Sequence, residues 1–481
     1  MNRSEDGAKT IKSIFSYSIA NIISLFISLI SVPIITRIIS VADLGIATSF
    51  TTLQNILTII WVFAINIAVD RMLLDVKNKE YEFLSSIYLC SSLFAILLSI
   101  IYVIFHDFLN QLVGFNLNMM LLMFSFIILI NGCTLLVAYW NFKNKYKFTF
   151  LYNLFASPVS QICSLLLAYI FSSNKYLGRI LGLNFFNACF GLGCGIYILV
   201  KGKCSFKVKY IYNSLKISIP MIPHLLSQVL LTSCDLLMIK NMVGSVEAGV
   251  YSMAYTISNI LYTVLIQLFT PWSPWFYRRM DNNEVDTINS NSKILMIFSF
   301  FLCIGLFTVA PEMIKFLLST DYLDAIYIVQ PICIGIFFQI MYKFFYDVEY
   351  FYKKNKQIAV FSAIVAFLNI MLNYFGIKYF GYQAAAYSTL ISYLLLLILH
   401  YYGMKSIEKR NLFDIKFLLF ISIVLFLIGC INIMFVNNFI FRYFILIFVA
   451  ILIFIKYNSF IRRLFEIFLL KREDNIGGKL K

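Results

Sequence analysis

The sequence predicts an all-α integral membrane protein of about 14 transmembrane helices, arranged as two six-helix bundles plus two extra C-terminal spans. Three observations carry this prediction. Apolar residues make up 61% of the chain and charged residues 13%, which is about half the charged share of a soluble domain. Apolar runs of about 20 residues, long enough to cross a bilayer, recur along the whole chain. Two stretches about 204 residues apart match each other, which indicates a duplicated unit.

The apolar runs place the expected helices in order. They lie at residues 13–35, 44–68, 83–105, 119–141, 149–172, 180–200, 217–239, 249–276, 294–311, 325–351, 357–377, 382–402, 415–436 and 439–456. The first six form one unit and the next six repeat it. We therefore expect an N-terminal lobe at residues 1–205 and a C-terminal lobe at 206–405. Residues 406–481 then hold the two extra spans and a basic tail.

The duplication rests on three matches in the same order. The first aligns Ile35–Ile59 with Ile239–Thr263 without a gap and pairs Gly45 with Gly249. The other two pair Phe142–Lys147 with Tyr352–Gln357, and Tyr176–Gly178 with Tyr379–Gly381. A unit of six spans returns to the side where it began. We therefore expect the halves to share one orientation and to be related by a pseudo-two-fold axis along the membrane normal.

Lysine and arginine predict the orientation. With the N-terminus inside, 31 of the 39 fall on the cytoplasmic side and 7, among them Arg179 in the loop before span six, on the opposite side. Both termini are therefore expected in the cytoplasm. Basic loops facing anionic lipid head groups also account for the net charge of +16 without nucleic acid. The N-terminal residues lack a small-residue cleavage site, so the first span is expected to act as the insertion signal.

The basic tail carries an amphipathic pattern. Phe460–Arg472 places its apolar residues on one helical face and Arg462 and Arg463 on another. This pattern predicts a helix lying on the inner membrane surface, the alternative being a frayed basic tail.

The sequence contains no pattern typical of an enzyme. The ten cysteines are scattered without CxxC spacing, so neither disulfides nor a metal site is expected. A glycine-rich phosphate loop is also missing, so ATP is not expected to drive the protein. We expect no catalytic residues and no cofactor.

Three segments carry a family resemblance. They are PIITRIISVADLG at Pro33–Gly45, the stretch Ser218–Asn259 with its paired prolines and internal Asp235, and PWSPWFY at Pro271–Tyr277. In these segments the chain resembles the polysaccharide repeat-unit flippases (Wzx type) of the multidrug/oligosaccharidyl-lipid/polysaccharide, or MATE-like, exporter superfamily. Asp43-Leu44-Gly45 departs from the more usual Tyr-Gly. Fourteen spans favour the polysaccharide branch over the twelve-span drug antiporters.

The resemblance implies a V-shaped pair of bundles around a central cavity. It also implies a flippase that carries an undecaprenyl-diphosphate-linked oligosaccharide across the bacterial cytoplasmic (inner) membrane, for O-antigen, capsule or another surface polysaccharide. A polysaccharide polymerase and glycosyltransferases are candidate partners. The alternatives are a cation-coupled multidrug exporter of the same superfamily and, from another class, an integral membrane polysaccharide polymerase or acyltransferase.

Charges inside or at the ends of spans are the candidate cavity residues. Each costs at least about 2.5–3.5 kcal/mol in the bilayer, and a diphosphate needs cations along its path. Spans one, two, seven and eight are the expected walls. The candidates for substrate binding are Arg37, Arg71, Asp235, Lys240 and Lys343, with Asp70 and Asp347 as coupling or pairing residues.

Most of these charged residues also have a structural explanation that involves no substrate. Lys343 and Asp347 are one helical turn apart and could simply neutralise each other. Arg37 and Lys240 could extend outward to water, and Asp70 with Arg71 could form an interfacial pair. The aromatic candidates for stacking on sugar rings are Trp140, Tyr251, Tyr255, Trp272 and Trp275.

Overall fold

The computed structural model describes residues 27, 30–76, 79–143 and 145–456, and these residues form helices with no β-strand among them. Within them, twelve helical segments are long and apolar enough to cross a membrane, and Phe439–Ile451 forms a shorter apolar one. The predicted all-α membrane fold is confirmed. The first predicted span, residues 13–35, lies mostly outside the described residues. The predicted surface helix at Phe460–Arg472 lies wholly outside them.

The described part of the N-terminal half begins with a helical stretch at residues 30–38. The helices that follow are α2 (Val41–Trp61), α3 (Ile67–Asp75), α4 (Glu80–Ile104), α5 (His106–Val113), α6 (Leu117–Phe142), α7 (Tyr146–Ile170) and α8 (Lys175–Lys201). Ser40 begins α2, because its side-chain oxygen accepts the backbone N–H of Asp43 at 3.1 Å. Asn116 begins α6 in the same way. Such caps satisfy N–H groups that have no partner within the helix.

The second predicted span, 44–68, is not one helix. It is interrupted at Phe63 and Ala64, whose φ angles of 56° and 47° lie in the left-handed region. Few non-glycine residues adopt this conformation, and it breaks the helical hydrogen-bond ladder. The chain therefore turns between α2 and the short α3.

The C-terminal half repeats the alternation of long helices and short connections. It comprises α9 (Val208–Ser218), η1 (Ile219–Met221), α10 (Ile222–Met242), α11 (Ser245–Phe269), α12 (Trp272–Asp281), α13 (Val285–Leu317), η2 (Thr320–Ala325), α14 (Ile326–Phe351), α15 (Asn355–Phe380) and α16 (Ala384–Ile407). The predicted span 249–276 divides at Pro271, because proline lacks an N–H and clashes with the preceding turn.

Helix starts in the two halves recur at nearly constant offsets. α2 and α11 begin 204 residues apart, and α4 and α13 begin 205 apart. The pairs α6/α14, α7/α15 and α8/α16 each begin 209 residues apart. Neighbours recur too: α8 packs on α6 and α7, as α16 packs on α14 and α15.

One of the three sequence matches is not part of this correspondence. Gly178 lies inside α8, whereas Gly381 follows α15 with a φ of 82°. The pairing of Tyr176–Gly178 with Tyr379–Gly381 is therefore wrong. Its offset of 203 residues differs from the 209 that relates the surrounding helices.

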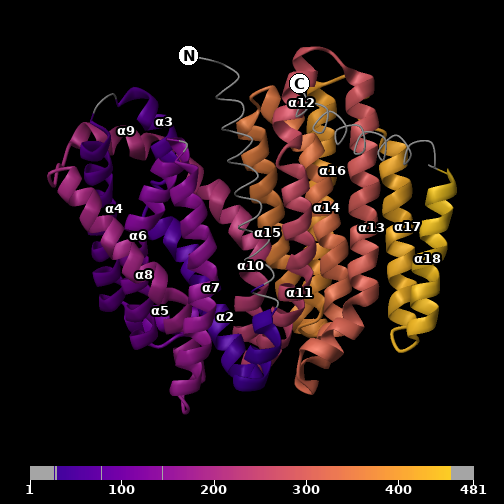
Figure 1. Cartoon of the computed structure of the whole chain (residues 1–481), viewed down its shortest axis with the longest axis horizontal. Helices are drawn as coiled ribbons and strands as arrows, with labels where there is room; N and C mark the ends of the chain where they lie inside the picture. The colour runs from indigo at the N-terminus through magenta and orange to yellow at the C-terminus, as the bar shows by residue number, and fades with distance from the viewer. Residues whose placement is uncertain (1–26, 28–29, 77–78, 144, 457–481) are drawn as a thin grey trace, which may run out of the picture.

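The two halves meet where α2 packs against α10 and α11 (Figure 1). A Cβ on Gly45 would overlap the carbonyl oxygen of Ser245, and a Cβ on Gly249 would overlap the carbonyl oxygen of Val41. Val41 and Ser245 occupy equivalent positions in the two copies of the repeat. The contact is therefore reciprocal, as at a two-fold interface, and it needs glycine on both sides.

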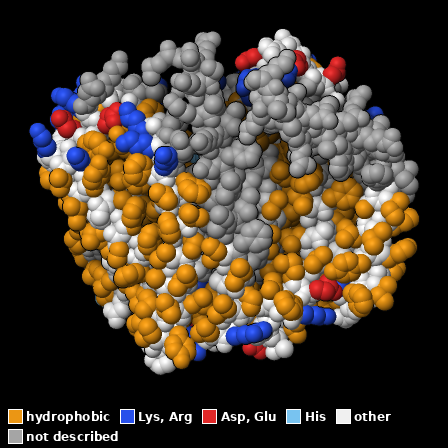
Figure 2. All heavy atoms as spheres, in the orientation of Figure 1, with side chains coloured by type: hydrophobic (Ala, Val, Ile, Leu, Met, Phe, Trp, Pro, Cys, Tyr) orange, Lys and Arg blue, Asp and Glu red, His pale blue; other side chains and the backbone are white. Residues whose placement is uncertain are grey.

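The surface divides into an apolar belt and charged ends. Figure 2 shows hydrophobic side chains covering the sides of the molecule, with Lys, Arg, Asp and Glu gathered towards the two ends. Large apolar side chains in the belt are exposed, among them Leu97, Phe367 and Phe448. Such a surface suits hydrocarbon rather than water. The chain is a multi-pass membrane protein.

The two extra spans, α17 (Ile415–Met434) and α18 (Phe439–Lys456), lie at the edge of the C-terminal half (Figure 1). Both pack against α13, and α17 also contacts α14. Arg442 of α18 is 1% exposed, donates to the carbonyl oxygen of Thr308 and pairs with Glu312 of α13. The pair docks α18 onto the C-terminal half at a charged contact.

Candidate functional site

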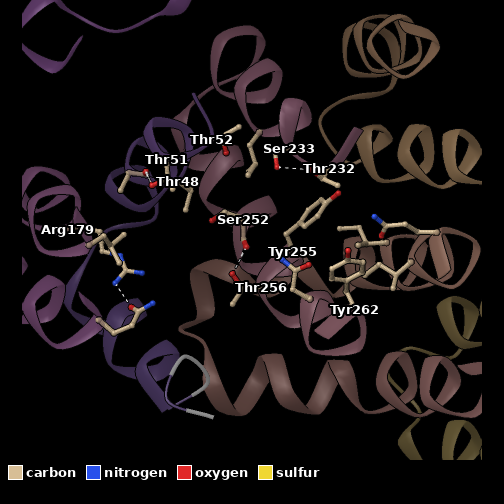
Figure 3. A pocket seen from close by; sticks show the side chains of 18 of the residues that line it. Thr48, Thr51, Thr52, Arg179, Thr232, Ser233, Ser252, Tyr255, Thr256 and Tyr262 are labelled. Carbon is tan, nitrogen blue, oxygen red and sulfur yellow. Dashed lines mark hydrogen bonds between the residues drawn. The ribbon is translucent and has the colours of Figure 1, made fainter. Parts of the chain in front are cut away.

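A cavity of about 650 Å³ lies between the two halves. Its walls come from α2, α7 and α8 on one side and from α10, α11, α14 and α16 on the other (Figure 3). The lining begins at Ala47 on α2 and at Ser252 on α11, just beyond Gly45 and Gly249. The contact of α2 with α11 at Gly45 and Gly249, which we call the glycine crossing, therefore closes one end of this cavity. We call the cavity the central cavity. The predicted walls from spans two, seven and eight are confirmed, and four more helices contribute.

Most residues that line the central cavity carry a hydroxyl or an amide group, and the described lining is nearly uncharged. Hydroxyl groups of α2 have repeat partners with hydroxyl groups on α11: Thr48 with Ser252, and Thr52 with Thr256. Tyr255, one of the aromatic candidates for stacking on sugar rings, also lines the cavity. Tyr251 does not line it, and Trp272 and Trp275 pack against each other. Hydroxyls, amides and aromatic faces are the groups that sugars bind.

Arg179 of α8 is the only charged residue among the described residues that line the central cavity. Its side chain is 8% exposed, and one guanidinium nitrogen donates to Gln161 Oε1 at 3.0 Å and to Ser164 Oγ at 2.6 Å. No described carboxylate lies within ion-pair distance of it. A buried cation held by neutral groups keeps its charge available for an anionic ligand.

Two glycines bring Arg179 to this place. A Cβ on Gly178 would overlap the backbone of Leu167, and a Cβ on Gly182 would overlap the backbone of Ser164. α8 therefore approaches α7 closely on this face, as in other small-xxx-small contacts between membrane helices. The sequence prediction counted Arg179 among the outer-loop cations and did not place it in the cavity lining. The signal was present in the Gly-Arg-x-x-Gly spacing at the start of the span.

A second cavity of about 650 Å³ lies within the N-terminal half, between α2, α6, α7 and α8. It shares Thr51, Gln161 and Leu183 with the central cavity, so the two adjoin beside Arg179. We call it the side chamber. Amide and hydroxyl side chains dominate its lining.

Asp235, one of the substrate-binding candidates from the sequence, lies behind the cavity wall. It is fully buried, and its Oδ2 accepts the hydroxyl of Tyr251 at 2.7 Å and that of Thr389 at 2.9 Å. Its Oδ1 has no partner among the described groups. Thr232 and Leu236 on the same helix do line the cavity. The carboxylate is therefore next to the cavity but shielded from it.

Lys240 joins the two halves rather than facing the cavity. Its ammonium group donates to the carbonyl oxygen of Gly114 at 2.6 Å and lies 3.4 Å from the ring centre of Phe115. Arg37 and Arg71 are exposed, and neither lines the central cavity. The side chain of Asp70 lies outside the described residues. The structure therefore does not gather these candidates into one site.

Lys343 and Asp347 share a small separate cavity of about 150 Å³ between α11, α12 and α14. Asp347 accepts hydrogen bonds from Ser273 at 2.9 Å and from Tyr277 at 3.1 Å. The ammonium group of Lys343 is not within ion-pair distance of it. The alternative in which the two residues simply neutralise each other has no direct contact to support it.

A family model described as polysaccharide biosynthesis protein matches residues 34–327. Among solved structures, the chain is similar to "Lipid II flippase MurJ, inward closed conformation", with 18% identity and a TM-score of 0.73 over 92% of this chain and 99% of that one. It is also similar to an inward-facing multidrug resistance MATE family transporter of the MOP superfamily, with 10% identity and a TM-score of 0.58 over 81% and 97%. At these identities the likeness establishes the fold. A comparison with curated protein sequences gives no match.

Proposed function

Because the chain belongs to the polysaccharide biosynthesis protein family, we propose that it is a flippase for undecaprenyl-diphosphate-linked oligosaccharide repeat units. It would move them from the cytoplasmic to the outer leaflet of the cytoplasmic membrane, where surface polysaccharide is assembled. A polysaccharide polymerase and the glycosyltransferases that build the unit are then its functional neighbours. The fold it shares with a lipid-linked flippase and with exporters supports transport rather than catalysis.

The observation that carries this proposal is that the described residues lining the central cavity include one cation and no anion. Arg179 lies between the two halves, among hydroxyl, amide and apolar side chains that carry no charge. A guanidinium group binds phosphate oxygens through two parallel hydrogen bonds, and its charge offsets theirs. The surrounding hydroxyl, amide and tyrosine groups suit sugar hydroxyls. A diphosphate bearing an oligosaccharide has both kinds of group.

The same observation weighs against the drug-exporter alternative. Lipophilic cationic drugs need a carboxylate where they bind, because a buried unpaired charge is costly. The described lining of the central cavity offers one cation and no carboxylate. Its sign therefore suits an anionic cargo. The polymerase or acyltransferase alternative needs a general base or an acid–base pair beside a nucleophile. The described lining has hydroxyl groups but no His, Cys, Asp, Glu or Lys to activate them.

We also propose an orientation and a role for the remaining charges. The glycine crossing faces the periplasm and both termini face the cytoplasm, as the distribution of Lys and Arg favours. The closed end then lies outside and the cavity awaits cargo from inside. Lys240 stabilises that closed end through its contact with Gly114 and Phe115. Asp235 and Lys343 act behind the wall, on the conformational change rather than on cargo.

The test replaces Arg179 in a strain lacking the chromosomal gene. We expect Arg179→Ala to lower surface polysaccharide at least tenfold and to raise undecaprenyl-linked repeat units in the inner leaflet, at normal expression. Arg179→Lys keeps the charge but not the paired hydrogen bonds, so we expect intermediate export. Arg278→Ala, at an exposed position of α12, is the matched control.

The two negative outcomes are distinct. Full export by Arg179→Ala at equal expression would remove Arg179 from the pathway. A deletion strain that accumulates no undecaprenyl-linked glycan would refute the flippase function itself.

A further inference from the structure

The side chamber of the N-terminal half is lined by an unusual concentration of amides. Six of its lining residues carry one: Gln54, Asn55, Asn153, Gln161, Asn184 and Asn187. Arg179, Leu183 and Asn187 follow at four-residue spacing on α8, so the cation and the chamber share one helical face. The chamber therefore continues from the cation of the central cavity along α8.

Part of the hydrogen-bonding capacity of the chamber is unused. Gln54 donates to Asn184 Oδ1 at 2.9 Å, but Gln54 Oε1 has no partner among the described groups. Ser160 Oγ is likewise buried without one. Gln54 is 8% exposed and Ser160 is 5% exposed. A buried polar atom without a partner is costly, and a ligand hydroxyl would satisfy it.

The side chamber differs in charge from the central cavity beside it. None of the described residues that line it is charged. Gln161 belongs to both cavities, and its side-chain oxygen accepts from Arg179 at 3.0 Å. An anionic group bound at Arg179 would therefore lie beside the chamber, whose described lining offers uncharged side chains only.

We propose that the side chamber is the glycan subsite, and that it takes repeat units whose sugars carry no carboxylate and no ammonium group. This inference rests on the proposed flippase function and names its substrate class. Each amide offers a donor and an acceptor, which matches the hydroxyl and N-acetyl groups of neutral sugars. The diphosphate binds at Arg179 beside the chamber.

The neutrality requirement follows from desolvation. A uronic acid in the chamber would bury a second negative charge beyond reach of an opposite charge among the described lining residues. An amino sugar would bury an ammonium group with no carboxylate to meet it. N-acetylation removes that charge, so acetamido sugars stay within the proposed class.

The first test identifies the glycan. Deleting the gene in its own host should cause undecaprenyl-linked units to accumulate, and mass spectrometry gives their composition. We expect hexoses, deoxyhexoses and acetamido sugars only. A unit containing a uronic acid or a free amino sugar overturns the chamber proposal but leaves the flippase function standing. If no lipid-linked unit accumulates, the flippase function fails and the chamber proposal falls with it.

The second test changes the chamber. Asn184→Leu removes an amide that donates to the carbonyl oxygen of Ile180 at 3.0 Å and accepts from Gln54. Asn432→Leu is the matched control, because Asn432 is a buried amide of α17 that donates to the carbonyl oxygen of Ile428 at 3.2 Å and lines neither cavity. The probes are the lipid purified from the deletion strain and bare undecaprenyl diphosphate, bound to protein in nanodiscs.

We expect Asn184→Leu to weaken binding of the glycan-bearing lipid at least tenfold and to leave binding of bare undecaprenyl diphosphate within twofold. Asn187→Gln, which keeps an amide, should bind the glycan-bearing lipid better than Asn187→Leu. The control should bind both lipids as the parent protein does. Equal losses for the two lipids, or no loss for the glycan-bearing one, would overturn the proposal.

Discussion

At the scale of single residues, three buried charges are held by neutral groups. Arg179 is bound by an amide and a hydroxyl, Asp235 by Tyr251 and Thr389, and Asp347 by Ser273 and Tyr277. Hydroxyl groups lower the cost of burying a charge without cancelling the charge. Each of the three therefore remains able to act on a ligand or on a moving helix.

Asp235 tests this interpretation. Asp235→Ala leaves the hydroxyls of Tyr251 and Thr389 without their shared acceptor and removes the charge. We expect surface polysaccharide to fall about tenfold. Asp235→Asn keeps one acceptor oxygen, so it should restore stability but not export if the charge matters. Asp107→Ala, at a side chain that is 94% exposed, is the control. Full export by Asp235→Ala at equal expression would contradict the proposed role.

Lys343 offers a second test at this scale. Its ammonium group shares a small cavity with Asp347 without pairing directly with it. We expect Lys343→Ala to lower surface polysaccharide severalfold while the protein still inserts normally. Lys343→Arg should retain more export if positive charge is the requirement. Immunoblots of membrane fractions and quantified surface polysaccharide give both readouts, and equal export by the two variants would remove the charge requirement.

At the scale of elements, the reciprocal crossing of α2 and α11 depends on two glycines. Gly45→Ala would press its Cβ on the carbonyl oxygen of Ser245, and overpacking of this kind costs about 1–3 kcal/mol. We expect a lower melting temperature in detergent and reduced export. Gly193→Ala in α8 is the matched control, because a Cβ there meets no atom within 4 Å. A melting temperature for Gly45→Ala equal to that of the control would contradict the tight crossing.

The connections that follow α12, α14 and α16 contain a hydrogen-bonded group, centred on Glu408, that we expect to respond to acid. Glu408, after α16, accepts from Tyr352 at 2.7 Å and from Arg410, whose guanidinium also donates to Asn283 at 2.7 Å. Hydrogen bonding to Arg410 lowers the pKa of Glu408 to about 2. A lowered pKa in the folded state means that the stabilisation is present near neutral pH and is lost as pH falls.

This sign gives a measurable pH profile. Glu408→Gln should lower the melting temperature at pH 7. The difference from the parent protein should decline once the pH falls below about 4.5, the ordinary value, and vanish towards pH 2. Thermal melts of purified protein across this range provide the test, with Asp107→Ala as the charge control. A difference that grows with acidity would show that the sign is wrong.

At the scale of the whole molecule, apolar runs and the internal repeat predicted most of the fold. Span order, the shared helix offsets and the pairing of Gly45 with Gly249 follow from local pattern. The breaks at Phe63 and Pro271 were missed, because apolar composition continues through them. That a rotation about the membrane normal superposes residues 1–205 on 206–405 stays a prediction.

The site was harder to predict than the fold. Sequence reasoning ranks charges by depth along a span, but it does not give the helical face that each one occupies. Lys240 was expected in the cavity and instead joins the halves, while Arg179 was expected in a loop and instead lines the cavity. Tight packing of α8 on α7, set by Gly178 and Gly182, decides the second case, and it depends on contacts between distant residues.

The orientation of the protein in the membrane decides which side the closed end of the central cavity faces. Asn116 begins α6 directly after Gly114 and Phe115, the residues that Lys240 contacts. Gly249 of the glycine crossing follows Lys240 closely along the chain, near the start of α11. A reporter fused after Asn116 therefore reports the side of the closed end. We expect it to behave as periplasmic and a fusion after Lys209, in α9, to behave as cytoplasmic. The cavity would then be closed to the outside, ready for a lipid-linked unit made on the inner leaflet. The reverse pattern would place the closed end in the cytoplasm, and cargo made there would have no entry in this conformation.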